Sequence, residues 1–144
     1  MAEPLTAIRL DEFLPYPPER VWRALTDPAR LARWLMPNDF RAEVGHRFSF
    51  RTEPVPGTGF DGVVACEVLA VEPERLLRIS WAGGPGLRTT VTWRLVVEGV
   101  GTRLFLDHEG FDPSDPAQRE ALRVMGGGWR THLMRRLEAV LADP

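Results

Sequence analysis

The chain has 144 residues, of which 44% are apolar and 26% charged, and its net charge is −2. This is the composition of a soluble globular protein, and the length suits one domain with its own core, so we expect a single domain over residues 1–144. The weak negative charge and the scattered arginines argue against a nucleic-acid or anionic-membrane face. No basic segment followed by an apolar run marks the N-terminus, and no stretch of about 18 apolar residues occurs, so we expect a cytoplasmic protein.

The first third of the chain predicts one strand followed by two short helices. Residues 5–14 place Ile8 and Leu10 in alternation, and the prolines of residues 15–18 end this strand. Pro18 suits the first position of a helix, and Asp27 followed by Pro28 is typical of a capped second helix. The predicted apolar faces are Val21, Trp22 and Leu25 in the first helix and Leu31, Trp34 and Leu35 in the second.

From residue 39 onward the hydrophobic period becomes that of strands. The candidate strands are residues 40–44, 46–52, 60–72, 75–82, 87–98 and 102–110. Most of their connections are short, which favours an antiparallel meander. In residues 60–72 both faces are apolar, so the register of that strand stays open. Alternation in the last three candidates predicts these inward side chains: Leu77, Ile79, Trp81, Val91, Trp93, Leu95, Val97, Leu104, Leu106 and His108.

Residues 115–144 predict a long C-terminal helix that packs against the sheet. Asp115 is a capping residue, and apolar side chains recur along one face: Leu122, Met125, Trp129, Leu133, Leu137, Val140 and Leu141. Three glycines at 126–128 predict a kink, a break or a close approach of another group. Arg136 projects inside the apolar arc with His132 on the same flank. These two side chains either reach solvent at its edge or line an internal cavity, where the arginine needs an acidic partner or an anionic ligand.

Several segments resemble one known family over essentially the whole chain. Residues 18–28 read PERVWRALTDP and continue to LARWL at 31–35, and residues 66–77 read CEVLAVEPERLL. Further matching segments are Trp81, residues 101–104, Gly110-Phe111 and Gly128-Trp129. This sequence is similar to the START-like (SRPBCC) superfamily, in particular the group related to the C-terminal domain of the activator of Hsp90 ATPase. The resemblance implies an α+β helix-grip (START/Bet v 1-like) fold: about seven antiparallel strands curved around the C-terminal helix, with an internal cavity for an apolar ligand.

The remaining sequence features limit the chemistry. Cys66 is the single cysteine, so no internal disulfide forms, and its apolar strand context favours a small buried side chain. His46, His108 and His132 lack metal-ligand spacing, so we expect neither a metal site nor a cofactor. No nucleophile elbow or phosphate-binding loop occurs, which argues against a hydrolase or a nucleotide-binding enzyme.

Three functions follow from this reading. The favoured one is a non-catalytic binding protein for a small hydrophobic or amphipathic molecule. A cyclase, aromatase or dehydratase on a polyketide-like substrate is the second, with His108 as the acid or base. A protein-interaction module, co-chaperone-like or homodimeric, is the third. The candidate ligand-lining residues are Trp34, Phe48, Trp81, Trp93, His108, Phe111, Met125, Trp129, His132 and Arg136.

Overall fold

The computed structural model describes residues 7–54, 61–83 and 86–143 of the chain. It is an α+β fold with one antiparallel sheet in the order β1-β6-β5-β4-β3-β2. The elements in chain order are β1 (Ala7–Leu14), α1 (Pro18–Thr26), α2 (Pro28–Trp34), β2 (Arg47–Arg51), β3 (Val63–Glu72), β4 (Leu76–Trp81), β5 (Thr89–Glu98), β6 (Gly101–Glu109), α3 (Pro116–Gly127), η1 (Gly128–Leu133) and α4 (Met134–Ala142).

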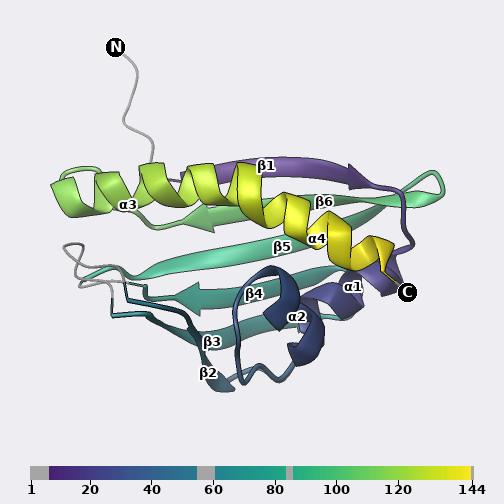
Figure 1. Cartoon of the computed structure of the whole chain (residues 1–144), viewed down its shortest axis with the longest axis horizontal. Helices are drawn as coiled ribbons and strands as arrows, with labels where there is room; N and C mark the ends of the chain where they lie inside the picture. The colour runs from purple at the N-terminus through teal and green to yellow at the C-terminus, as the bar shows by residue number, and fades with distance from the viewer. Residues whose placement is uncertain (1–6, 55–60, 84–85, 144) are drawn as a thin grey trace, which may run out of the picture.

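The three C-terminal helical segments run as one long rod across the sheet, as Figure 1 shows. The rod lies along β1 and β6 at its α3 end, and its α4 end reaches the short helices α1 and α2. The face of the sheet under the rod carries the core, which is built from leucine, isoleucine, valine and aromatic side chains. Within the described part of the chain, no helix is long and apolar enough to cross a membrane.

The short helices form as their caps predict. Pro18 and Pro28 each occupy the first turn, and the Asp27 side chain accepts the Ala29 backbone N–H at 3.1 Å. Both predicted apolar faces are buried except at Trp22, which is half-buried.

In the described residues the sheet has six strands where the sequence predicted about seven, because residues 40–44 form no strand. The chain turns there instead: the Glu43 N–H donates to the Arg41 carbonyl oxygen at 2.8 Å, and the His46 N–H donates to the Glu43 carbonyl oxygen at 3.0 Å. Polar side chains bind backbone N–H groups on either side of this turn. Asn38 accepts the Phe40 N–H at 3.0 Å, and Asp39 accepts the Ser49 N–H at 2.9 Å. The predicted strands at residues 5–14 and 60–72 begin at Ala7 and Val63 in the described part, while residues 5, 6 and 60 lie outside the described residues.

The structure decides the register that the sequence left open. Val64, Cys66 and Val68 of β3 face the core, and the pairing with β4 shifts by one residue between Val68 and Ala70. Val97 was predicted to face inward but is 68% exposed. It lies at the end of the β5–β6 hairpin, which projects beyond the helical rod, so no helix covers it.

The rod contains a π-helical turn over Gly128–Leu133, which begins at the last of the three glycines where the sequence predicted an irregularity. A π turn adds a residue to the turn, so the buried stripe changes phase along the rod. Met134 is buried in place of the predicted Leu133, which is half-buried. The same phase change explains why Arg136 is exposed, although the regular helical period placed it inside the apolar arc.

Candidate ligand-binding site

His108 on β6 is fully buried, and both of its ring nitrogens have a hydrogen-bond partner. Trp129 Nε1 donates to His108 Nδ1 at 3.1 Å. His108 Nε2 lies 2.8 Å from Thr89 Oγ1, and that hydroxyl donates to the Trp81 carbonyl oxygen at 2.7 Å. Because the single hydroxyl proton of Thr89 is used, the ring must be the neutral tautomer with a proton on Nε2. We call Trp129, His108, Thr89 and Trp81 the His108 chain.

Burial also determines the charge of this histidine. It lowers the pKa of His108 to about 3, because a buried imidazolium loses its hydration. A general acid or base needs a pKa near the working pH and a nitrogen that can reach substrate. His108 is neutral at physiological pH and both nitrogens are engaged, so the geometry suits a residue that ties η1 to β5 and β6.

The inward aromatic side chains form one connected cluster around the His108 chain. Trp81 lies 5.5 Å from His108 and 5.8 Å from Trp129, measured between ring centroids. Trp93 lies 6.1 Å from Trp129, and Phe111 lies 4.8 Å from His108. The cluster continues along β2, where Phe50 lies 5.4 Å from both Trp81 and Phe48. The structure therefore brings together six of the predicted site residues, namely Phe48, Trp81, Trp93, His108, Phe111 and Trp129.

The other four predicted site residues lie apart from this cluster or at its edge. Trp34 is buried between the short helices, where its Nε1 donates to the Ala24 carbonyl at 2.7 Å. His132 and Arg136 are exposed, so neither forms part of a buried wall. Met125 is half-buried on α3.

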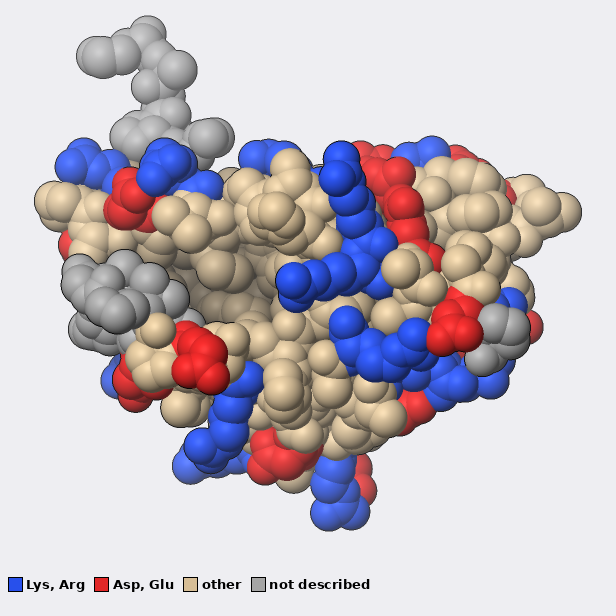
Figure 2. All heavy atoms as spheres, in the orientation of Figure 1, with Lys and Arg blue, Asp and Glu red and all other residues tan. Residues whose placement is uncertain are grey.

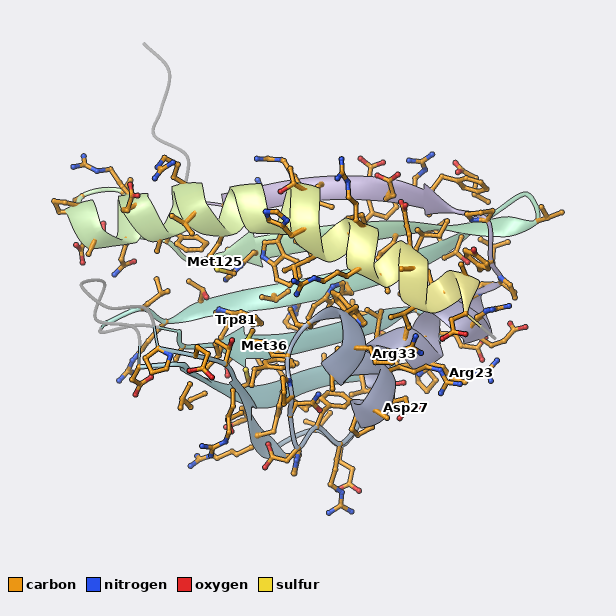
Figure 3. The ribbon with its side chains drawn as sticks, viewed as in Figure 1. Arg23, Asp27, Arg33, Met36, Trp81 and Met125 are labelled. Atoms are coloured by element: carbon orange, nitrogen blue, oxygen red, sulfur yellow. The ribbon has the colours of Figure 1, made fainter. Side chains whose placement is uncertain are left out.

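A hollow opens between α3 and the sheet. Figure 2 shows it as a concave region lined by residues without charge, in the same orientation as Figure 1. Figure 3 places Met125 of α3 on one side of it, with Trp81 of β4 and Met36 of the α2–β2 connection on the other. Met36 and Met125 are half-buried, so apolar side chains from separate elements meet at its border.

The burial of the helical rod explains why the hollow lies at this end. In α4, four side chains are buried: Met134, Leu137, Val140 and Leu141. In α3, Gly126 is the one buried residue, and Ala121, Leu122 and Met125 are half-buried. The α3 half therefore leaves apolar surface incompletely covered.

A second concavity of about 280 Å³ lies beside Trp81, with Cys66 and Thr89 among its lining residues. This volume is slightly below the roughly 300–1,000 Å³ of typical small-molecule sites. Burial, with a smaller contribution from Asp39, raises the pKa of the Cys66 thiol to about 12, so the thiolate nucleophile is scarce. In the described residues, no group of three His, Cys, Asp or Glu side chains could hold a metal ion.

Comparisons with known proteins agree with this architecture. Residues 15–142 match the family described as activator of Hsp90 ATPase homolog 1-like protein. The chain belongs to this family. No curated protein matches it. Among solved structures, protein MLL2253 from Mesorhizobium loti is 37% identical with a TM-score of 0.82, and the alignment covers 94% of this chain and 96% of that one.

Two further relatives share the fold over nearly all of this chain. CalU16 from Micromonospora echinospora is 27% identical with a TM-score of 0.74, covering 95% of this chain and 76% of its own. DynU16, a protein in the dynemicin biosynthetic locus, is 27% identical with a TM-score of 0.78 over 97% of this chain. The chain spans about half of DynU16, since the alignment covers 48% of it.

In this family member, the segments that carried the resemblance contribute to the packing of the fold. Trp34 joins α2 to α1 through its hydrogen bond to Ala24. At Gly101, a Cβ would lie 2.5 Å from the Leu14 carbonyl oxygen and 2.7 Å from the Phe13 ring, so β6 reaches β1 only with glycine there. These residues explain why the signature predicts the fold well, since they are required whatever the ligand.

Sequence reasoning missed three residues of this region. Thr89 continues the inward alternation predicted from Val91, and Phe50 lies two residues after Phe48, a candidate ligand-lining residue, so counting two positions from each would have found both. Met36 lies in an irregular connection that carries no periodic signal, and only the folded chain brings it to the hollow.

Proposed function

We propose that this protein binds a small hydrophobic or amphipathic molecule in the hollow between α3 and the sheet, without transforming it. The observation that carries the proposal is the half-burial of the apolar face of α3, in a rod whose α4 half is fully packed. A ligand under α3 would cover this surface, and each Å² of apolar area removed from water contributes about 25 cal/mol.

The π turn supports a role for α3 as the movable wall of the site. Gly126, Gly127 and Gly128 lie at its start, and glycines lower the stability of regular helix by about 1 kcal/mol each relative to alanine. A Cβ at Gly127 or Gly128 would meet nothing within 4 Å, so packing does not require glycine at either position. Glycines at this junction allow α3 to tilt away from the sheet while α4 stays packed.

The His108 chain supports binding over catalysis. The polyketide cyclase, aromatase or dehydratase alternative rests on His108 as the acid or base, and that ring has both nitrogens engaged inside the core. A polar end of the ligand would instead lie at the exposed mouth of the hollow.

The test uses two adjacent residues of α3 with opposite surroundings. Met125 is half-buried at the hollow, whereas Val124 is 56% exposed. The protein is titrated with the amphipathic fluorophore 1-anilinonaphthalene-8-sulfonate, and native mass spectrometry of protein purified from its source cells looks for a bound small molecule. We expect Met125→Glu to weaken fluorophore binding at least about tenfold, because it places a charge on the apolar wall, and Val124→Glu to change it little. Equal effects of the two variants, or no saturable binding by the native protein, would refute the proposal.

A further inference from the structure

Four arginines that are scattered along α1 and α2 converge where these helices meet the end of α4. Figure 3 shows Arg23, Arg33 and the intervening Asp27 at this end of the molecule, away from the hollow under α3. A groove of about 180 Å³ lies here. We call it the arginine groove, and its lining residues are Arg20, Arg23, Ala24, Arg30, Val140, Leu141 and Asp143.

The acidic residues at the groove neutralise only part of its charge. Asp27 forms an ion pair with Arg30, and Asp143 pairs with Arg33 at 2.6 Å. Among the residues that the structure describes, no carboxylate lies within salt-bridge distance of Arg20 or Arg23. The end of the α4 helix adds about half a negative charge, which favours nearby cations but does not balance both of these guanidinium groups.

Most of these side chains are held in place before any ligand arrives. Arg20 is half-buried with its guanidinium over the Tyr16 ring, 5.1 Å from the centroid. Arg30 and Arg33 are fixed by their aspartate partners. Arg23 is exposed and can turn towards the groove. Preorganised guanidinium groups lose little conformational entropy when they bind an anion.

We propose that the arginine groove binds a phosphate or diphosphate group. Guanidinium groups that approach from two helices suit a tetrahedral anion with several oxygens better than a carboxylate with two. At about 30 Å³ for each displaced water, the groove volume of 180 Å³ corresponds to about six waters, which is room for a compact anion. Ala24, Val140 and Leu141 form an apolar floor that lowers the local dielectric and strengthens the ion pairs.

The experiment is isothermal titration calorimetry of the full chain with pyrophosphate and with inorganic phosphate, at constant physiological ionic strength. The groove variant is Arg20→Gln with Arg23→Gln. The control, Arg51→Gln with Arg119→Gln, removes the same charge at exposed positions on β2 and α3. We expect the groove variant to lose at least about tenfold in pyrophosphate affinity, the size of one charge-assisted hydrogen bond, and the control to lose less than about twofold.

Two further measurements keep the proposal falsifiable. Asp143→Asn removes a negative charge from the groove and releases Arg33, so it is expected to tighten pyrophosphate binding. Arg23→Gln alone is the milder groove variant, because it alters one exposed side chain and is the least able to disturb folding. Circular dichroism checks that each variant is folded. Tighter binding of pyrophosphate than of phosphate indicates that the groove takes a diphosphate group, and equal binding indicates that it takes a single phosphate group; either supports the site. No binding of either anion by the native protein, or equal losses in the groove and control variants, would overturn it.

Discussion

Replacement of Thr89 by valine tests whether the His108 chain holds the helical rod to the sheet. Valine keeps the shape and β-branching of threonine but removes the hydroxyl that joins His108 Nε2 to the Trp81 carbonyl. A change of tautomer would not restore the hydrogen bonds of His108, because a proton on Nδ1 would then face the indole N–H of Trp129. The variant therefore leaves a buried N–H without an acceptor.

The expected cost follows from these two lost contacts. A buried donor without a partner costs about 1–3 kcal/mol, and the lost hydrogen bond to the Trp81 oxygen adds about 0.5–1.5 kcal/mol. We expect Thr89→Val to lower the free energy of unfolding by about 2–4 kcal/mol, a large share of the 5–15 kcal/mol that is typical of domains. Thr92→Val is the matched control, because Thr92 is also buried, but its partner Arg78 is exposed and can bind water instead. Its cost should stay below about 1 kcal/mol.

The assay is equilibrium unfolding in urea, followed by tryptophan fluorescence, for the native protein and the two valine variants. Nitrogen NMR of the histidine rings reads the tautomer separately, and we expect a neutral His108 protonated at Nε2. If Thr89→Val costs no more than Thr92→Val, the His108 chain contributes nothing to stability. A different tautomer would refute the assignment of donors and acceptors.

Two further predictions concern pH and close packing. The pKa of His108 is about 3 in the folded state, below its ordinary value of 6.5. Between these two values, the unfolded chain binds a proton at His108 and the folded chain does not. The free energy of unfolding is therefore unaffected by this group above pH 6.5 and falls below it by up to about 1.4 kcal/mol per pH unit. Urea titrations at pH 6.5 and 4.5 should show the loss, and a folded His108→Gln protein should lack this dependence on pH. Gly101→Ala should destabilise by about 1–3 kcal/mol because its Cβ would meet the Leu14 carbonyl oxygen at 2.5 Å, whereas Gly127→Ala, whose methyl meets open space, should raise the melting temperature.

The core was predictable because alternation and capping depend on neighbours in sequence. The inward residues of β4, β5 and β6 were predicted correctly except Val97, whose exposure depends on where the helical rod stops rather than on the strand itself. The segment at residues 40–44 was mistaken for a strand because local bonds shape its backbone: Asn38 accepts the Phe40 N–H, and the Glu43 N–H donates to the Arg41 carbonyl oxygen. Strand propensity does not weigh such bonds.

The candidate site was harder to predict, because an aromatic side chain that fills a core and one that lines a ligand site have the same periodicity. Trp34 illustrates this, since it satisfied the pattern yet lies between α1 and α2 with its indole N–H bonded to a backbone oxygen. Leu133 was misplaced for a different reason, whereas the exposure of Arg136 agrees with the first of its two alternatives, a side chain that reaches solvent. The π turn adds a residue to the helical repeat, and no sequence period reports where such a turn begins.

The rod is packed differently on the two sides of that turn. Trp129 lies within it and is the residue through which the rod is bonded to His108, and the side chains that follow in α4 are buried. Before it, α3 ends in two glycines, Gly126 and Gly127, and has an apolar face that is only half-covered. In the proposed function, a molecule bound under α3 meets the less closely packed end of the rod, while Trp129 and His108 tie the π turn to the sheet. On this proposal the aromatic cluster is the fixed side of the site, and we expect substitutions on the apolar face of α3 to change binding more than substitutions in α4.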